Sequence, residues 1–310
     1  MRVDSWLDTH TWTSHDWPPA LVGSMIEASG TTVAVVLPAL NEEATVGQIV
    51  AQIAQLMGAE GWVHELVVVD SGSTDETAAV AAAAGARVVR REEVLTELPP
   101  VPGKGEAMWR GLAATTSDIV VFVDADLQSF STDYISGLTG PLLADSGLQL
   151  VKAIYERPLV AADQVVPAGG GRVTELMARP LINRFWPELA DMVQPLAGEY
   201  AGRRTLLESL PFPCGYGIEL ALMVDTYQRH GMAALGQVDL GVRVHRHHHT
   251  PGLGLMAAEI LDTALRRVNP GDPTQQNPPE LTQFERTRDG FRARRRELSV
   301  TERPPLRDIR

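Results

Sequence analysis

Two aspartates, Asp124 and Asp126, directly follow an apolar stretch at positions 119–123 that predicts a buried strand. Residues two positions apart in an extended strand lie on the same side, so the two carboxylates would be neighbours. Neighbouring acids repel each other, and a divalent cation is the usual reason to keep them together, because Mg²⁺ and Mn²⁺ prefer oxygen ligands. A turn and a helix cap would explain the same residues, so the surrounding motifs must decide between the two interpretations.

Two more polar loops follow predicted strands, which lie at positions 32–37 and 65–69. Helix capping would explain each loop taken alone. Because both loops follow strands, as Asp124 does, plain capping is a less attractive explanation, and the three loops lie where open α/β sheets bind ligands. In the second loop, Asp70 could accept a hydrogen bond from a nucleobase, and Ser71 could donate one. The first loop contains Pro38, Ala39, Leu40, Asn41 and Glu42.

Lys104 lies between Gly103 and Gly105, just before a predicted helix. A Walker phosphate loop requires Ser or Thr directly after its lysine, and Gly105 takes that place here, so a P-loop ATPase is excluded. The remaining interpretation is a cation at a helix N-terminus that contacts a diphosphate or a sugar oxygen. A solvated surface lysine is the alternative, which the two flanking glycines make less attractive.

A run of three glycines ends at Gly171 and continues into Arg172, Val173 and Thr174. Glycine lets backbone amides approach an anion closely, and arginine adds a bidentate donor for phosphate or carboxylate. A flexible linker is the alternative, but it fits poorly with the helix start that follows. The run therefore predicts an anion-binding loop.

A histidine-rich segment at 243–249 follows the last predicted strand. Neutral imidazole is a normal ligand for Mn²⁺, so we expect His245 to bind a metal beside Asp126. Arg243 or Arg246 would then contact phosphate, and His247–His249 would face solvent. Cys214 has no activating base nearby in the sequence, and we interpret it as structural.

Strands and helices alternate along most of the chain, which predicts an α/β fold with a mainly parallel, doubly wound sheet and helices on both faces. Predicted helices lie at 46–57, 78–84, 133–144 and 253–267. We expect an N-terminal arm at 1–30, either packed on a body or partly ordered, and a nucleotide-sugar-binding half at 31–155. An acceptor-binding half of the same domain follows at 156–268. The few apolar residues in 269–310 predict a disordered or peripheral tail.

Composition narrows the classes of protein further. The chain has 310 residues, of which 44% are hydrophobic and 21% charged, as in an ordinary globular protein. A net charge of −12 argues against nucleic-acid binding, which usually requires a basic domain. No apolar run approaches the ~20 residues of a membrane span. A single cysteine fits the reducing cytoplasm.

The motifs LPALNEE, VVDSGSTDET, VPGKGEAMWRGL, VFVDAD, GGGRVTEL, QPLAGEY and GYGIEL occur in this order. This pattern resembles the glucosyl-3-phosphoglycerate synthases of actinobacteria over about residues 1–268. The resemblance implies a retaining GT-A glycosyltransferase, with a divalent metal (Mg²⁺ or Mn²⁺), that acts as a homodimer. Its reaction would transfer glucose from UDP-glucose to the 2-hydroxyl of D-3-phosphoglycerate.

The resemblance also implies site residues, by motif position. The donor site would comprise Pro38, Ala39, Leu40, Asn41, Glu42, Ser71, Lys104, Asp124 and Asp126. Its acceptor site would comprise Gly171, Arg172, Val173 and Thr174, with Tyr216 and Glu219 nearby. The metal would bind Asp126 and His245. One departure follows that histidine: the family carries Arg-Asn-Arg where this chain has Arg246-His247-His248.

The expected mechanism leaves one choice open. Retention by double displacement would need a carboxylate nucleophile, for which Glu219 is the candidate, whereas front-face attack needs none. Three other classes share parts of the pattern. They are mannosyl-3-phosphoglycerate synthases that use GDP-mannose, polyprenyl-phosphate glycosyltransferases, and non-catalytic sugar-nucleotide sensors.

Overall fold

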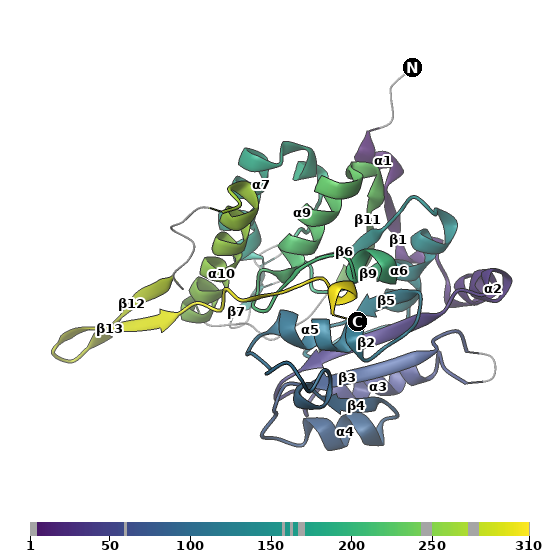
Figure 1. The fold of residues 1–310 in the computed structure, drawn as a ribbon, viewed down its shortest axis with the longest axis horizontal. Coiled ribbons are helices and arrows are strands. Elements are labelled where there is room, and N and C mark those ends of the chain that lie inside the picture. The colour runs from purple at the N-terminus through teal and green to yellow at the C-terminus, as the bar shows by residue number, and fades with distance from the viewer. Residues whose placement is uncertain are drawn as a thin grey trace.

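A central eight-stranded sheet organises the molecule (Figure 1). The computed structural model describes residues 5–58, 61–156, 159–161, 164–166, 171–242, 250–271 and 279–309. The strands of this sheet are β1 (Thr11–Thr13), β2 (Val33–Ala39), β3 (Glu65–Asp70), β4 (Arg87–Arg90), β5 (Ile119–Phe122), β6 (Leu150–Glu156), β9 (Tyr200–Arg203) and β11 (Leu235–Val242). Their spatial order is β1-β11-β6-β9-β5-β2-β3-β4. Among these described strands, β9 runs antiparallel to β5 and β6, and the other neighbouring pairs are parallel.

Helices cover both faces of the sheet. They are α1 (Trp6–Thr9), α2 (Pro19–Ser29), α3 (Val46–Ala54), α4 (Thr77–Ala83), α5 (Lys104–Ala113), α6 (Asp133–Ala144), α7 (Arg179–Phe185), α8 (Arg204–Leu207), α9 (Ile218–His230) and α10 (Thr250–Val268). Within the described ranges, none of these helices combines the length and hydrophobicity that a membrane span requires.

The apolar sequence of β2 explains the two covered faces, because successive side chains of a strand point to opposite sides. Val35 and Leu37 pack in one buried cluster with residues of α2, α3 and α6. Val36 packs in a second cluster with Met108 of α5 and Leu220 of α9. The expected α/β architecture, with helices on both faces, is therefore confirmed.

The chain path brings the carboxyl ends of β2 and β5 together. It runs outward from β2 through β3 to β4 and then returns, so that β5 pairs with β2 on its other side. Such a reversal of strand order opens a crevice above the carboxyl ends of the two strands, which is where open α/β sheets bind ligands. The loops after β2, β3 and β5 all reach this crevice.

The N-terminal arm packs on the body of its own chain. Strand β1 pairs with β11 at the edge of the central sheet. Trp12 and Trp17 lie against the buried core, and the indole Nε1 of Trp6 donates to the carbonyl of Met232 at 2.9 Å. Of the two alternatives for this segment, the packed arm describes the structure.

The C-terminal segment is folded where the structure describes it. Strands β12 (Glu280–Thr287) and β13 (Gly290–Glu297) form a hairpin that projects from the body (Figure 1). Strand β14 (Glu302–Arg303) then pairs with β10 (Phe212–Pro213), and Leu306 is fully buried. The expectation for 269–310 was a disordered or peripheral tail. Residues 279–309 are ordered, and Arg303 pairs with the buried Glu106. The hairpin itself is peripheral. A further pair is formed by β7 (Leu159–Ala161) and β8 (Gln164–Val166).

Candidate active site

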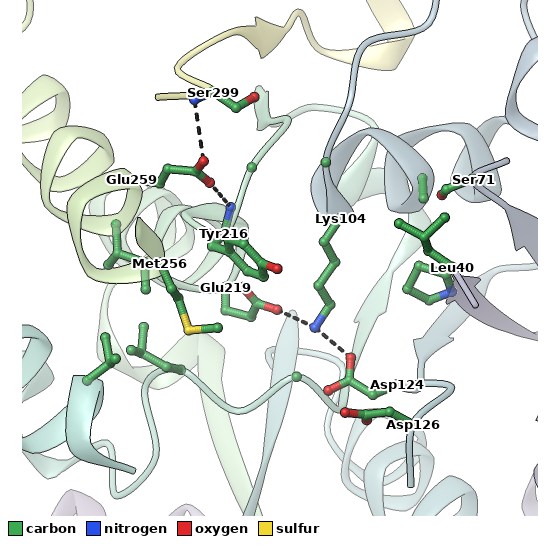
Figure 2. Close-up of a pocket in the computed structure, with 18 of the residues that line it drawn as sticks. Leu40, Ser71, Lys104, Asp124, Asp126, Tyr216, Glu219, Met256, Glu259 and Ser299 are labelled. Atoms are coloured by element: carbon green, nitrogen blue, oxygen red, sulfur yellow. Dashed lines mark hydrogen bonds and ion pairs between the residues drawn. The ribbon is translucent and has the colours of Figure 1, made fainter. Parts of the chain in front are cut away.

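A cavity of about 550 Å³ lies above the carboxyl ends of β2, β3 and β5. Figure 2 shows its centre, where Lys104 extends between Glu219 and Asp124, with Leu40 and Ser71 on one side and Tyr216 on the other. The cavity joins the residues predicted for the donor and those predicted for the acceptor. Its walls include Pro38, Ala39, Leu40, Glu42, Ser71, Lys104, Asp124, Asp126, Gly171, Arg172, Val173, Thr174, Tyr216 and Glu219.

Lys104 connects two carboxylates that come from distant parts of the chain. Its Nζ lies 2.6 Å from Oδ1 of Asp124 and 2.6 Å from Oε1 of Glu219. Burial alone would lower the pKa of Lys104, but the charges and hydrogen bonds of the two carboxylates raise that pKa well above its usual value. Lys104 is therefore a fixed cation at the centre of the cavity.

The glycines beside Lys104 allow two backbone segments to pack closely. A side chain at Gly103 would collide with the carbonyl of Cys214, and one at Gly105 would collide with the carbonyl of Pro213. Gly103 also has a φ of +130°, which L side chains rarely adopt. This packing aims Lys104, the first residue of α5, into the cavity. The glycines therefore position the cation by contact with protein backbone.

Asp124 and Asp126 lie side by side at the floor of the cavity (Figure 2). Gly198 leaves room for Asp124, because a Cβ at that position would overlap its carboxylate. Asp124 is paired with Lys104, and Asp126 lines the same cavity beside it. Carboxylate oxygens at this place suit Mg²⁺ or Mn²⁺, so the described residues fit the expected ion.

The second expected metal ligand cannot be placed. His245, with Arg243, Arg246 and the rest of 243–249, lies outside the described residues. Among those that are described, no group of three or more His, Cys, Asp and Glu side chains is arranged to hold a metal. A metal site that Asp126 forms with a residue of 243–249 would include residues outside the described ranges.

Two predicted donor residues stabilise the loops and do not line the cavity. Asn41 has a φ of +58°, and its Oδ1 accepts a hydrogen bond from the amide of Thr74 at 2.8 Å. The amide of Asn41 donates to Oγ of Ser73 at 2.9 Å, and the amide of Ser73 donates to Oδ1 of Asp70 at 3.1 Å. These bonds join the loops after β2 and β3. They hold Leu40 and Ser71 in place, and Asn41 and Asp70 are not among the residues that line the cavity.

The predicted acceptor residues enter the cavity from its other side. Gly171 has a φ of +74°, and the chain continues from it through Arg172 into a helical turn at Thr174–Ala178 and then α7. Gly171 thus makes the sharp turn that brings Arg172 to the cavity wall. Gly169 and Gly170 lie outside the described residues.

A buried glutamate supports the acceptor side and was not predicted. Glu259 of α10 lines the cavity, and its Oε2 accepts from the amide of Tyr216 at 2.9 Å. Its Oε1 accepts from the amide of Ser299 at 3.4 Å, which ties the C-terminal segment to the site. Burial raises the pKa of Glu259. Nothing in the local sequence distinguishes this residue from a solvent-facing acid of an amphipathic helix. Other wall residues that were not predicted include Arg91, Leu196, Gly198, Leu253, Met256 and Ile260.

Comparison with known proteins identifies the family. Residues 34–146 match the family described as glycosyl transferase family 2. A glucosyl-3-phosphoglycerate synthase of Mycolicibacterium smegmatis is 49% identical over 98% of this chain and 98% of its own length. One of Mycobacterium tuberculosis is 47% identical over 98% of this chain and 93% of its own length. The chain belongs to the glucosyl-3-phosphoglycerate synthase family.

Solved structures of the family agree with the fold. The Mycobacterium tuberculosis enzyme in complex with Mn²⁺, UDP-glucose and phosphoglyceric acid superposes with a TM-score of 0.84 and 46% identity, covering 95% of this chain and 96% of that one. Its complex with Mg²⁺ and UDP gives a TM-score of 0.86 at 45% identity, over 97% and 99%. The resemblance inferred from the motifs, and the GT-A fold that it implies, are confirmed.

Proposed function

We propose that this protein is a metal-dependent, retaining glucosyltransferase that moves glucose from UDP-glucose to the 2-hydroxyl of D-3-phosphoglycerate. The observation that carries this proposal is the position of Lys104, which pairs with Asp124 and Glu219 in one cavity. The donor loops form one side of that cavity and the loop at Gly171 forms the other. Relatives that match almost the whole chain are named for this reaction.

The donor would lie along the loops after β2, β3 and β5. Leu40 and Ser71 would contact the nucleoside, and Asp124 would accept hydrogen bonds from hydroxyl groups of the ribose or the glucose. Asp126 and His245 would hold Mg²⁺ or Mn²⁺ against the diphosphate. When bound, the ion would supply positive charge that stabilises the departing phosphate.

The acceptor would lie between the loop at Gly171 and Tyr216. Arg172 carries a guanidinium that can bind the phosphate or the carboxylate of D-3-phosphoglycerate with two hydrogen bonds. Val173 and Thr174 would border the same anion, and Arg243 or Arg246 would add positive charge from the 243–249 segment. This local positive charge would outweigh the net negative charge of the chain, because salt screens charges that lie farther away than about 8 Å.

The arrangement of Glu219 favours front-face transfer. Its carboxylate is held by Lys104 at 2.6 Å, and this ion pair lowers its availability as a nucleophile. In the transfer, the 2-hydroxyl oxygen of the acceptor forms a bond to C1 of glucose as the bond from C1 to the diphosphate oxygen breaks. The hydroxyl proton passes to that departing oxygen. UDP leaves from the same face of the glucose on which the acceptor enters, which retains the configuration at C1. Lys104 and Glu219 would hold the sugar for this step.

Three other functions share parts of the motif set, and the names of the relatives favour the glucosyl reaction over each of them. A mannosyl-3-phosphoglycerate synthase would use GDP-mannose. A polyprenyl-phosphate glycosyltransferase would need a lipid acceptor. A sugar-nucleotide sensor would bind the donor without turnover, and it would have no need of the complete metal site formed by Asp124, Asp126 and His245 beside Lys104.

A matrix of donors against acceptors tests the proposal. Purified protein would be assayed with UDP-glucose, GDP-glucose and GDP-mannose, each with D-3-phosphoglycerate or a polyprenyl phosphate, with and without a chelator. We expect the highest kcat/KM with UDP-glucose and D-3-phosphoglycerate, and its loss with chelator. Preference for GDP-mannose, or tight UDP-glucose binding without product from any pair, would contradict the proposal.

We further propose a cytoplasmic homodimer. The hairpin of β12 and β13 exposes Phe284 by 69% and Phe291 by 68%, which is a large apolar area on a projecting element. The hairpin is also rich in arginine, which complements the net charge of −12 of a second copy. The buried free thiol of Cys214 is compatible with a reducing compartment.

Sedimentation velocity tests the dimer. We expect the wild type to sediment as a dimer and the Phe284→Ser, Phe291→Ser double variant as a folded monomer. Leu21→Ser, which changes an exposed leucine of α2, serves as the matched control and should leave the dimer intact. A wild-type monomer at micromolar concentration would rule out this interface.

A further inference from the structure

Lys152 of β6 is a buried lysine directly behind the candidate active site. Its side chain is only 1% exposed, although lysine is almost never fully buried unless it is paired. Its Nζ donates to the carbonyl of Ala197 at 3.0 Å and lies 4.8 Å from the centre of the Tyr200 ring. Among the described residues it makes no ion pair within salt-bridge distance. Burial of an ammonium group without an ion pair costs free energy, so a functional role is needed to explain why Lys152 lies here.

The carbonyl that Lys152 contacts belongs to a turn that borders the cavity. The amide of Ala197 donates to the carbonyl of Gln194 at 3.0 Å, which closes the turn, and the Gln194 side chain donates to the carbonyl of Tyr155. Strand β6 therefore holds this turn at two points, Lys152 and Tyr155. The turn leads directly to Gly198, which packs on the carboxylate of Asp124. Any shift of the turn would consequently move Asp124 or expose it.

Lys152 also belongs to the charge cluster below the cavity. Its ammonium is attracted by the carboxylates of Glu219, Glu199 and Asp124 and repelled by the ammonium of Lys104. In this group of five, three carboxylates face two cations. Removing one cation would increase the excess of negative charge close to the place where the donor diphosphate must bind, which would weaken donor binding.

We propose that Lys152 is a positioning residue for glucosyl transfer: its ammonium holds the turn at Leu196–Gly198 against Asp124 and offsets the carboxylates around Lys104. This inference rests on the proposed function. Tyr200 supports the same arrangement from the adjacent strand, because its ring lies under the ammonium while its hydroxyl contacts Sδ of Met108 on α5 at 3.7 Å. Lys152 thus connects the turn to the helix that carries Lys104.

The protonation of Lys152 gives the proposal a distinctive signature. Burial lowers the pKa of Lys152 to about 8, and repulsion by Lys104 acts in the same direction. Attraction by the carboxylates of Glu219, Glu199 and Asp124 opposes this shift. Burial raises the pKa of the neighbouring Tyr200 well above its usual value, so Tyr200 remains neutral in this range. The ammonium is therefore present below pH of about 8 and is lost as the pH rises through that value. Activity should fall over the same interval.

The test compares Lys152→Met and Lys152→Arg with the wild type, in the full-length protein. We would measure kcat and KM for UDP-glucose against pH, with Mn²⁺ and saturating D-3-phosphoglycerate, and the affinity for UDP with Mn²⁺ by calorimetry. Lys152→Met should lower kcat roughly 10- to 100-fold and weaken UDP binding, because Asp124 is displaced. Lys152→Arg keeps the charge, so it should retain more activity and move the alkaline decline to higher pH.

Arg203→Met is the matched control. Arg203 is a cation of the neighbouring strand β9, and its guanidinium donates to the carbonyls of Leu148 and Leu142, away from the cavity. This change should lower Tm without moving the pH profile or the UDP affinity.

Three outcomes separate the proposals. Wild-type kcat, UDP affinity and alkaline decline in Lys152→Met would overturn the role of Lys152. If Lys152→Met does not fold, an unchanged alkaline decline in Lys152→Arg would overturn it equally. If the wild type transfers no glucose, the proposed function fails, and the UDP affinities of the same variants still decide whether Lys152 positions Asp124.

Discussion

The Nζ of Lys104 lies 2.6 Å from Oε1 of Glu219, a residue 115 positions later in the chain. Lys104 begins α5 and Glu219 lies in the first turn of α9, so this ion pair connects two helices packed on one face of the sheet. It also links the part of the chain predicted to bind the donor with the part predicted to bind the acceptor. The proposed reaction takes place across this contact.

Replacement of Lys104 by methionine should show whether its contact with Glu219 serves the reaction or only the fold. The side chains have similar length, but the change leaves Asp124 and Glu219 close together without their shared cation. We expect kcat/KM for UDP-glucose to fall roughly 100- to 1,000-fold, because a positioned charge is lost from a partly buried site. Steady-state kinetics with D-3-phosphoglycerate would measure this loss. Activity within a few-fold of wild type would show that Lys104 serves only the fold.

Glu219→Gln distinguishes the two mechanisms of retention. Front-face transfer does not require a carboxylate nucleophile, so this variant should keep measurable turnover, reduced by the weaker contact with Lys104. A fluorinated analogue of UDP-glucose would be added to the wild type, and intact mass spectrometry would search for a glucosyl-enzyme. We expect no adduct. A covalent sugar on the wild type that is absent from Glu219→Gln would establish double displacement.

Asp126→Ala should abolish metal-dependent transfer, since this carboxylate is the expected ligand of the ion in the described part of the cavity. Isothermal titration with Mn²⁺ and UDP should show the loss of coupled binding. Asp133→Ala, a change of another acid at the start of α6, should preserve both transfer and binding. Near-normal turnover in Asp126→Ala would refute the assignment of the metal site.

The contact of Arg303 with Glu106 predicts that the C-terminal segment stabilises the fold. Glu106 is fully buried, and Nε of Arg303 donates to its Oε2 at 2.7 Å. Arg303→Met would remove one of the two arginines that pair with this carboxylate, leaving Arg110 as the other, and should lower the free energy of unfolding by about 3 kcal/mol. Chemical denaturation would measure this change. Arg307→Met, in an exposed pair with Asp308, should have almost no effect, and equal effects of the two changes would contradict the prediction.

Local patterns in the sequence were enough to predict the fold and much of the cavity wall. Apolar runs such as 66–69 predict buried strands, and a parallel sheet brings the residues that follow them to one edge. Asp124 and Asp126 could be placed together because they lie two positions apart at the end of one strand. The shared edge explains Leu40 and Ser71, whereas Lys104 was predicted from its two flanking glycines before a helix.

Contacts between distant elements could not be predicted in this way. The pairing of Lys104 with Glu219, and the support of Tyr216 by Glu259, depend on how helices pack and leave no local signal. Asn41 and Asp70 have the polar side chains that a nucleotide site needs, but Asn41 accepts a hydrogen bond from the neighbouring loop and Asp70 accepts one within its own loop. In the C-terminal segment, the scarcity of apolar residues predicted a disordered or peripheral tail. The contact of Arg303 with Glu106 could not be predicted, because the two residues lie 197 positions apart.

The most direct test of the account is the structure of the product formed from ¹³C-labelled UDP-glucose and D-3-phosphoglycerate in the presence of Mn²⁺. Nuclear magnetic resonance would identify the carbon to which C1 of glucose is joined and the configuration at C1. The account predicts a single product, with glucose linked to the 2-hydroxyl oxygen of D-3-phosphoglycerate and the configuration of the donor retained. Release of free glucose alone, linkage at another position or an inverted C1 would contradict it.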